Sequence, residues 1–355
     1  MKVSFDPNLL NELLDLAHNP PGGDPVLGAF YTSIVDMVEK DHPIAKIFMD
    51  VKSQRPDITY KHLTYLIFRA YQAVKFKRHD LSYRNLKSVS KWEKELSTVY
   101  SNKSEYLRSL LNTKSVTTTI YQRYIGPFAL ISFLWNKKEV SIADLGCGGN
   151  YGLRGLELRE PFKPFKDLTA KQLITKFILQ PINLSKGLAV DKENPDEEEV
   201  RAWRIACSFY PQELDNLEAI KKFENRIMRS KKVEFIKTDL LKLNQLPKKS
   251  FDIVILSTTL YQLNLSQQLT ILTRAKQLLQ PNGYIIVQDF AVKSLARPTH
   301  LDFSESWFRR KFSYRTFITG KATSWKFLEV LQWNNGRCEI VRAGKDFKKV
   351  FSERA

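Results

Sequence analysis

The fold is indicated most clearly by residues 141–152, which read Ser141-Ile-Ala-Asp-Leu-Gly-Cys-Gly-Gly-Asn-Tyr-Gly152. It is typical of a buried strand that runs into a glycine-rich turn and then a helix, and ligands bind at such turns in open α/β sheets. Because Gly146 and Gly148 have no Cβ atom, a ligand can lie directly against the backbone there. The dinucleotide pattern GxGxxG fails, since it requires a glycine where Tyr151 stands. A nicotinamide cofactor is therefore disfavoured.

Short apolar runs alternate with helical stretches after residue 139. The predicted strands are residues 140–145, 187–191, 233–238, 251–257 and 284–288. This alternation is typical of a parallel sheet with helices on both faces. Two further strands are expected at residues 314–319 and 338–342, joined through residues 325–336, as an antiparallel pair at the sheet edge. We therefore predict a doubly wound, Rossmann-like α/β fold with a seven-stranded sheet.

The first 115 residues show helical periodicity and no strand-like alternation. Asp6-Pro7 and Asp24-Pro25 each combine an N-capping residue with a proline at the first helical position. Apolar residues then recur at helical spacing. We predict an all-helical N-terminal domain at residues 1–115, which serves as a lid or substrate domain, and a catalytic domain at residues 116–355.

The glycine-rich turn resembles motif I of class I S-adenosylmethionine-dependent methyltransferases, which consists of an acidic residue, any residue and then GxGxG. Asp144, Gly146 and Gly148 match this pattern, with Cys147 between the two glycines. Asn150 replaces the third glycine, and asparagine is one of the few residues that adopt a positive φ. The resemblance implies that S-adenosylmethionine is the cofactor and that these residues hold it. The alternative is a turn that only connects a strand to a helix.

Asp191 ends the second predicted strand, where the resemblance implies contact with the cofactor ribose. A carboxylate has two acceptor oxygens and can take the protons of both hydroxyls. Asp191 lies 47 residues after Asp144, whereas about 20 residues is the usual interval. A helical insertion near residues 161–186 is therefore expected. Alternatively, Asp191 is a surface residue ahead of an acidic helix start.

Further contacts to the cofactor follow from the same resemblance. Asp239 and Leu240 come after the third strand and are expected at the adenine, and Ser257 ends the fourth strand. Tyr121 and Arg123 lie on the helix before the first strand, from which Arg can grip the cofactor carboxylate with two parallel hydrogen bonds. The alternative is that Tyr121 packs in the interior and Arg123 is a solvated helix residue.

Tyr261, just beyond the fourth strand, is the candidate catalytic base or orienting residue. A tyrosine with a pKa near 10 is a poor base unless its environment changes that value, so a packing role is the alternative. Methyl transfer can also proceed without a base when the reactants are held aligned and away from water. Cys147 is interpreted as a small residue that packs against the ligand, not as a nucleophile.

A weaker resemblance covers most of the chain. Residues 24–31, 115–123 and 203–212 are similar to blocks of an uncharacterised bacterial family that has a helical N-terminal region and a methyltransferase-like domain. This likeness supports the domain layout and does not identify the methyl acceptor.

Charge and composition limit the partners. The net charge is +18, and basic residues exceed acidic ones most strongly in residues 61–115 and 291–355. These flanks allow an RNA acceptor, although a solvated lysine-rich surface is the plainer explanation. No Asn/Asp-Pro-Pro-Tyr motif or Pro-Cys pair is present after the fourth strand, which disfavours methylation of base amino groups or of cytosine carbon.

The three cysteines are far apart, which indicates neither a disulfide framework nor a metal site and favours the cytoplasm. No apolar run is long enough for a membrane span. We expect a small-molecule methyltransferase, with an RNA methyltransferase and a non-catalytic ligand-binding protein on the same fold as alternatives.

Overall fold

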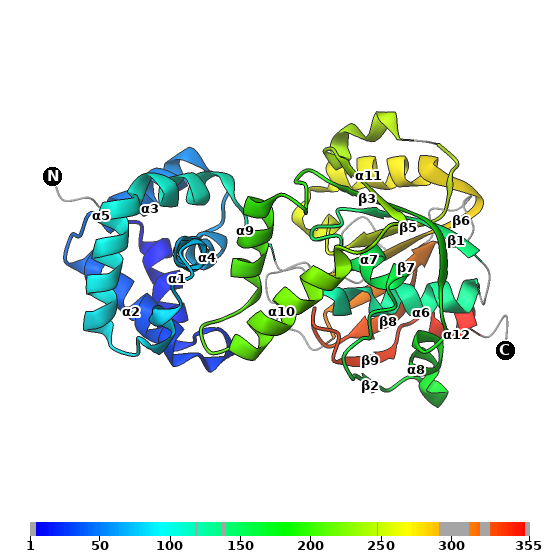
Figure 1. The fold of residues 1–355 in the computed structure, drawn as a ribbon, viewed down its shortest axis with the longest axis horizontal. Helices are drawn as coiled ribbons and strands as arrows, with labels where there is room; N and C mark the ends of the chain where they lie inside the picture. Colours follow the sequence, from blue (N-terminus) through cyan, green and yellow to red (C-terminus); the bar gives the residue numbers. More distant parts are fainter. Residues whose placement is uncertain are drawn as a thin grey trace. The chain divides into compact units, whose positions relative to one another are not determined.

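The computed structural model describes residues 5–117, 120–135, 139–246, 248–290, 312–319 and 327–351. Contacts divide the chain into a helical unit, Met1–Thr118 with Glu197–Phe223, and a sheet unit, Thr119–Asp196 with Glu224–Ala355 (Figure 1). The sequence-based division at residue 115 kept residues 197–223 with the catalytic domain. The chain instead leaves the sheet unit after the strand that ends at Asp191, contributes two helices to the helical unit, and returns.

The helical unit is built from long amphipathic helices. Its helices are α1 (Pro7–His18), α2 (Pro25–Glu39), α3 (Ile44–Gln54), α4 (Tyr60–Lys77), α5 (Val89–Thr113), α9 (Glu198–Ser208) and most of α10 (Leu214–Ile227), with 3-10 turns η1 (Pro21–Gly23) and η2 (Ser82–Asn85). Both predicted N-caps are confirmed: Asp6 accepts a hydrogen bond from the Asn8 amide at 2.8 Å, and Asp24 from the Val26 amide at 2.9 Å. Each cap satisfies one of the amides that a helix start leaves without a partner.

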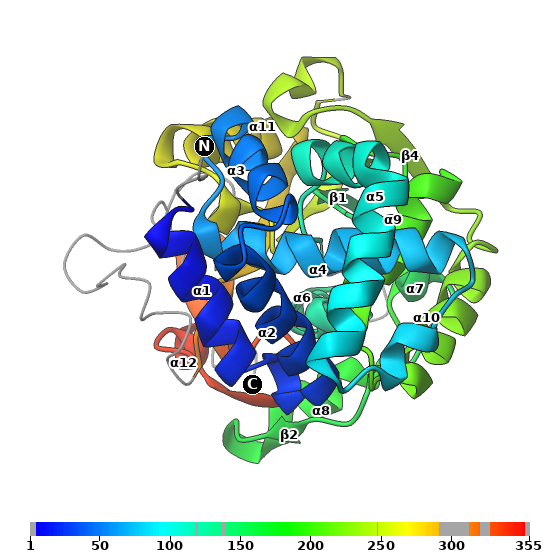
Figure 2. The ribbon, with the colours of Figure 1, turned by 90° about the vertical axis from the view of Figure 1, so that its left-hand side faces the viewer.

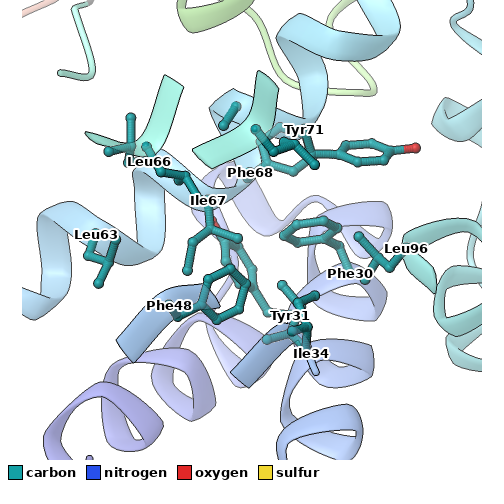
Figure 3. Packing of buried hydrophobic residues seen from close by; sticks show 14 of the residues in the cluster. Phe30, Tyr31, Ile34, Phe48, Leu63, Leu66, Ile67, Phe68, Tyr71 and Leu96 are labelled. Carbon is teal, nitrogen blue, oxygen red and sulfur yellow. The ribbon is translucent and has the colours of Figure 1, made fainter. Parts of the chain in front are cut away.

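The core of the helical unit is aromatic. The ring centre of Phe30 of α2 lies 5.1 Å from that of Phe68 of α4, in edge-to-face geometry (Figure 3). The ring centre of Trp92 of α5 lies at the same distance from Phe30, also edge to face. Helix α4, seen end-on in Figure 1 and crosswise in Figure 2, packs against α1, α5 and α9. Such ring pairs add directional contacts to the burial of apolar surface, and they hold α2, α4 and α5 together.

Side chains of α4 explain why residues 197–223 belong to the helical unit. Arg69 donates to the Ala206 carbonyl at 3.2 Å, and Gln72 donates to the Phe209 carbonyl at 3.0 Å. These carbonyls end α9 and would otherwise lack partners. The Arg69 guanidinium also lies 4.3 Å from the centre of the Tyr210 ring. The end of α9 is thus fixed to α4 by polar contacts.

Within the described residues, the sheet of the other unit has nine strands, not the predicted seven, in the order β2-β9-β8-β7-β6-β5-β1-β3-β4. The strands are β1 (Glu139–Leu145), β2 (Lys166–Asp167), β3 (Asn183–Asp191), β4 (Val233–Lys237), β5 (Phe251–Ser257), β6 (Leu279–Asp289), β7 (Tyr314–Thr319), β8 (Phe327–Trp333) and β9 (Ile340–Ala343). Strands β4, β3, β1, β5 and β6 are parallel, whereas β7 and β8 are antiparallel to their neighbours.

Two strands were missed in the sequence. Strand β8 lies within the stretch that was predicted to join two strands, and most of its residues are buried, so no alternation of polar and apolar residues marks it. Residues 325 and 326 of that stretch, and residues 118 and 119 of the weaker family likeness, lie outside the described residues. Strand β2 has only two residues and falls within the expected insertion, which also contains α8 (Leu173–Ile178).

Helices cover both faces of the sheet, as the doubly wound fold predicts. Helix α11 (Leu265–Leu278) packs on one face, and α6 (Ile125–Leu134) and α7 (Tyr151–Glu157) pack on the other (Figure 1). The remaining short elements are η3 (Tyr121–Tyr124), η4 (Ala170–Gln172), η5 (Leu240–Gln245), η6 (Leu260–Gln262) and α12 (Phe347–Phe351). Among the described helices, none combines the length and hydropathy of a membrane span.

Candidate functional site

Three carboxylates lie at the carboxyl ends of parallel strands of one sheet, in which β1 and β3 are adjacent and β5 separates β1 from β6. Asp144 is the second-last residue of β1, Asp191 is the last residue of β3, and Asp289 is the last residue of β6. Ligands bind at this edge in open α/β sheets. Asp289 was not among the predicted site residues, although its position after the apolar run 284–287 matches that of the other two. Its carboxylate accepts hydrogen bonds from the Leu260 amide at 2.8 Å and the Phe290 amide at 2.8 Å, and burial raises its pKa to about 7.

The glycine-rich turn after β1 adopts left-handed backbone conformations. Gly146, Gly148 and Asn150 have φ values of 79°, 55° and 54°. The prediction that Asn150 takes a positive φ is confirmed. The Gly146 amide donates to the Val190 carbonyl at 2.8 Å, which ties the turn to β3. The turn is therefore a defined cradle between β1 and β3.

Asp191 points at this cradle. Its Oδ2 atom accepts a hydrogen bond from the Gly148 amide at 2.8 Å, and its Oδ1 atom accepts one from the Glu193 amide at 3.4 Å. Burial raises the pKa of the carboxyl group, and the two backbone hydrogen bonds oppose that rise. The structure thus brings together the predicted acid and the predicted turn, which lie more than 40 residues apart.

Several buried polar atoms around the cradle have no hydrogen-bond partner within the described part of the chain. They are Asp144 Oδ1, both side-chain polar atoms of Asn150, and Ser257 Oγ. Buried polar atoms normally have partners, so such atoms need an explanation. The set contains acceptors, an amide donor and a hydroxyl, which suits a ligand that carries amino and hydroxyl groups. S-adenosylmethionine has both kinds of group, and the residues present therefore fit it.

Tyr124 of η3 contacts the Asp144 carboxylate beside the cradle, and it was not among the predicted site residues. Its hydroxyl donates to Asp144 Oδ2 at 2.8 Å. Its ring fills the space over Gly152, where an added Cβ would lie 2.2 Å from a ring carbon. Burial raises the pKa of Asp144 to about 7, the hydrogen bond from Tyr124 opposes this rise, and the negative charge of Asp191 adds to it.

Replacing Asp144 by asparagine is expected to make folding less sensitive to pH. A folded-state pKa above the ordinary value of about 4 means that the neutral form stabilises the fold, and this stabilisation is lost as pH rises through about 7. Between pH 5 and pH 8, the unmodified cofactor-free protein should lose roughly 2–3 kcal/mol of unfolding free energy relative to Asp144→Asn. Urea titrations at several pH values measure this difference, and parallel curves for the two proteins would contradict it.

Tyr121 and Arg123 are placed at two different points. Tyr121 donates from its hydroxyl to the Glu160 carbonyl at 3.1 Å and stacks on Phe162 at 4.5 Å, beside the carboxyl-terminal end of α7. Arg123 donates from Nε to the Gly336 carbonyl at 3.2 Å, in the turn after β8. That either side chain reaches the cofactor carboxylate is still a prediction.

Tyr261 lies in η6, beyond the end of β5, with 36% of its surface exposed. Its ring meets Phe290 edge to face at 5.3 Å. Burial, and next the negative charge of Asp289, raise the pKa of Tyr261 above its ordinary value. The phenol therefore stays protonated at neutral pH, which favours an orienting role over that of a base.

The remaining predicted residues lie around the same edge. Asp239 is exposed at the end of β4, and its Oδ1 caps η5 through the Leu241 amide at 2.8 Å. Leu240 packs against the sheet core, and Ser257 closes β5. Burial raises the pKa of the Cys147 thiol well above its ordinary value, which supports packing over nucleophilic attack. In the described ranges no group of His, Cys, Asp or Glu residues could hold a metal ion.

A family model matches part of the chain. Residues 216–340 match the family model of a methyltransferase domain. Among curated proteins, none matches the chain in sequence. The matched range begins after the glycine-rich turn and after Asp191, so it does not include the cradle.

Solved structures give remote similarities. The N-methyltransferase NodS from Bradyrhizobium japonicum, in complex with S-adenosyl-L-homocysteine, is 14% identical, covers 47% of this chain and 60% of its own, and has a TM-score of 0.27. An S-adenosylmethionine-dependent methyltransferase from Mesorhizobium loti is 18% identical, covers 46% of this chain and 52% of its own, and has a TM-score of 0.26. One from Aquifex aeolicus is 18% identical, with 52% and 79% covered and a TM-score of 0.25. The chain thus spans only part of each of these structures.

The family match and the site define the class of the sheet unit. Residues 216–340, of which 224–340 lie in the sheet unit, match a methyltransferase domain. The resemblance inferred from Asp144, Gly146 and Gly148 is thereby confirmed for this domain.

Proposed function

We propose that the protein transfers a methyl group from S-adenosylmethionine to a small-molecule acceptor. The observation that carries this proposal is the contact of Asp191 with the Gly148 amide, in a cradle whose buried polar atoms lack partners within the described residues. When bound, the cofactor supplies a methyl group on a positively charged sulfur. Asp191, Asn150 and the backbone of Gly148 would hold the cofactor while an acceptor atom takes this methyl group.

The residues of the chain have separable tasks in this proposal. Asp191 accepts hydrogen bonds from the ribose hydroxyls, and Asp239 with Leu240 borders the adenine. Asp144 and Asn150 bind the amino-acid end, where a positively charged amine favours the ionised form of Asp144. The backbone of Gly146 and Gly148 lets the ligand lie close to the chain.

The side chains next to the cradle support a small acceptor. Tyr261 and Tyr314 flank Phe290, with ring centres 5.3 Å and 4.9 Å from it, at the carboxyl ends of β5 and β6 and the start of β7. Aromatic side chains with a few placed polar groups, here Asp289 beside Tyr261, are typical of small-molecule sites. They also keep water from the reacting atoms, from which methyl transfer benefits.

An RNA acceptor is the competing proposal, and the basic charge favours it. Residues 61–115 carry 12 basic and four acidic side chains. Binding of RNA through such residues would weaken steeply as salt is raised. A third alternative is a protein that binds the cofactor without catalysis.

Transfer of labelled methyl groups distinguishes these proposals. The protein is incubated with methyl-tritiated S-adenosylmethionine and, separately, a small-molecule cell extract, total RNA and an extract of proteins. Label is expected in the small-molecule fraction and should be absent with the Asp191→Asn variant. Label in RNA, with steep salt dependence, would overturn the small acceptor. Label in no fraction, despite tight binding of S-adenosylhomocysteine, would favour the non-catalytic alternative.

A further inference from the structure

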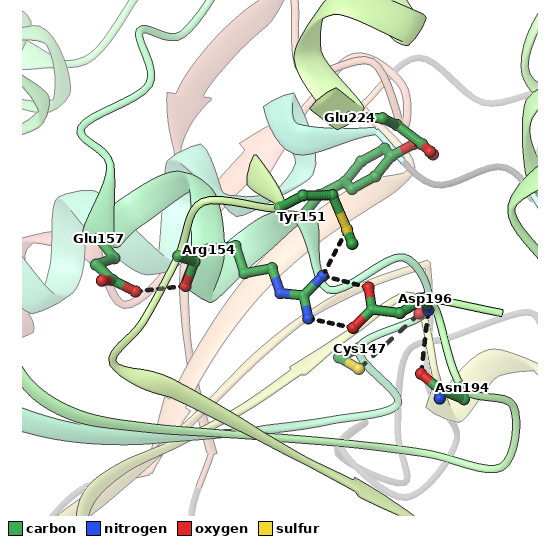
Figure 4. A network of polar contacts seen from close by, with 10 residues as sticks. Cys147, Tyr151, Arg154, Glu157, Asn194, Asp196 and Glu224 are labelled. Carbon is green, nitrogen blue, oxygen red and sulfur yellow. Dashed lines mark hydrogen bonds and ion pairs between the residues drawn. The ribbon is translucent and has the colours of Figure 1, made fainter. Parts of the chain in front are cut away.

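Helix α7 contacts both points where the chain passes between the two units. Asp196 is the last residue of the sheet unit before α9, and Glu224 is the first after the chain returns. Both are bonded to side chains of α7, which begins directly after Asn150 (Figure 4). The helix that follows the cofactor cradle therefore also holds the ends of the inserted segment.

Arg154 of α7 makes the stronger of these contacts. Its Nη1 and Nη2 atoms donate to Asp196 Oδ1 and Oδ2 at 2.6 Å and 2.7 Å. Only 10% of the Arg154 side chain is exposed, against 33% of that of Asp196. A two-pronged pair of this kind fixes both the distance and the orientation of the carboxylate. Asp196 is thus held in one position relative to α7.

Tyr151 makes the second contact, at the first turn of α7. Its hydroxyl donates to Glu224 Oε1, and Glu224 is almost completely buried. Met228, one turn further along the returning chain, places its sulfur 3.5 Å from Arg154 Nη1. The segment that returns to the sheet unit is therefore also bound to α7.

The short connection from Asp191 to Asp196 carries the ribose acid at one end and the Arg154 pair at the other. Asp191 accepts the amide of Glu193, and Asn194 Oδ1 accepts the amide of Asp196 at 3.0 Å. Each hydrogen bond tightens the connection into a compact turn. Asp196 and the Asp191 carboxylate are therefore joined by a short turn that its own hydrogen bonds hold.

We propose that Arg154 is a positioning residue for the cofactor: by gripping Asp196, it holds the Asp191 turn and the glycine-rich cradle in the relative placement that the ribose needs. This inference rests on the proposed function, because it assumes that Asp191 binds the cofactor. It adds that cofactor binding steadies the two chain crossings at Asp196 and Glu224, so the segment that joins the helical unit responds to occupancy of the cradle.

A matched control is available in the same unit. Arg226 makes an equally two-pronged pair with Glu160, with both distances 2.7 Å, outside the Asp191 turn. If Arg154 served the stability of the fold alone, removal of either pair would leave cofactor affinity unchanged. If Arg154 positions Asp191, only its removal weakens binding.

The test compares Arg154→Gln with Arg226→Gln in the full-length protein, by calorimetric titration with S-adenosylhomocysteine. Arg154→Gln is expected to raise the dissociation constant on the order of tenfold, the usual effect of losing a residue that orients a ligand-binding group. Arg226→Gln should stay within about twofold. Arg154→Lys keeps the positive charge and loses the two-pronged pair with Asp196, so its dissociation constant should lie between those of the other two variants. It replaces Arg154→Gln in the test if that variant does not fold.

Hydrogen exchange gives a second readout that does not depend on turnover. S-adenosylhomocysteine should slow exchange of the backbone amides of residues 192–194, 196–197 and 224–228 in the unmodified protein, and much less in Arg154→Gln. Unchanged affinity and unchanged protection in Arg154→Gln would overturn the inference and leave the cofactor site intact. Failure of the unmodified protein to bind S-adenosylhomocysteine would overturn the proposed function itself, and the inference with it.

Discussion

Replacing Asp191 by asparagine is expected to weaken binding of S-adenosylhomocysteine by about 10- to 100-fold. The carboxylate offers two acceptor oxygens to the ribose diol, whereas asparagine offers one acceptor and one donor. A hydrogen bond to a charged group contributes about 1.5–3 kcal/mol, which sets this range. Titration calorimetry at pH 8 measures it, because the raised pKa of Asp191 requires a pH at which the group is ionised.

The control for this variant is Glu234→Gln, which removes an acidic group from an exposed position of β4. It should bind S-adenosylhomocysteine as the unmodified protein does. Equal affinities for Asp191→Asn and Glu234→Gln would show that the ribose is not held by Asp191, even if the domain binds the cofactor elsewhere.

Replacing Gly146 by alanine is expected to cost about 2–4 kcal/mol of unfolding free energy and to abolish measurable cofactor binding. Its φ of 79° is unfavourable for any residue with a Cβ atom, and the added Cβ would lie 2.5 Å from Thr259 Oγ1 and 2.7 Å from Thr259 Cγ2. The turn must therefore shift, and the cradle shifts with it. Urea unfolding measures the stability, and calorimetry measures the binding.

Two further variants separate the causes. In Gly336→Ala the backbone φ is not positive and the nearest atom to the new Cβ, Phe290 Cζ, is at 3.4 Å, at the lower limit of ordinary contact, so stability should change little. Adding Thr259→Ala to Gly146→Ala removes the two closest contacts and leaves the Cβ of residue 259 at 3.2 Å and the strain in φ, so it should restore part of the lost stability. A Gly146→Ala protein with unmodified stability and affinity would contradict the geometry of the cradle.

Local patterns predicted the elements on which the site is built. The glycine spacing at Gly146 and Gly148 indicated a ligand-binding turn, and the replacement of a third glycine by Asn150 was compatible with it because asparagine adopts positive φ. The acid at the end of the second predicted strand, Asp191, points at the turn as expected. These features are encoded within a few residues of one another or by strand order.

Features that depend on distant partners could not be predicted in the same way. Assignment of α9 to the helical unit depends on Arg69 and Gln72, more than 130 residues earlier in the chain. The role of Tyr124 depends on the space that Gly152 leaves for its ring. Asp289 carried the same sequence pattern as Asp191, but its bonds to the amides of η6 appear only in the fold.

We propose that the turn from Leu145 to Asn150 and the Asp191 carboxylate together bind the cofactor. A crystal structure of the protein with S-adenosylhomocysteine tests it most directly. We expect the ribose hydroxyls to lie within hydrogen-bond distance of Asp191, and the amino-acid end of the ligand to lie beside Asp144 and Asn150. A ligand bound elsewhere, with the Asp191 carboxylate still paired only with the Gly148 and Glu193 amides, would contradict it.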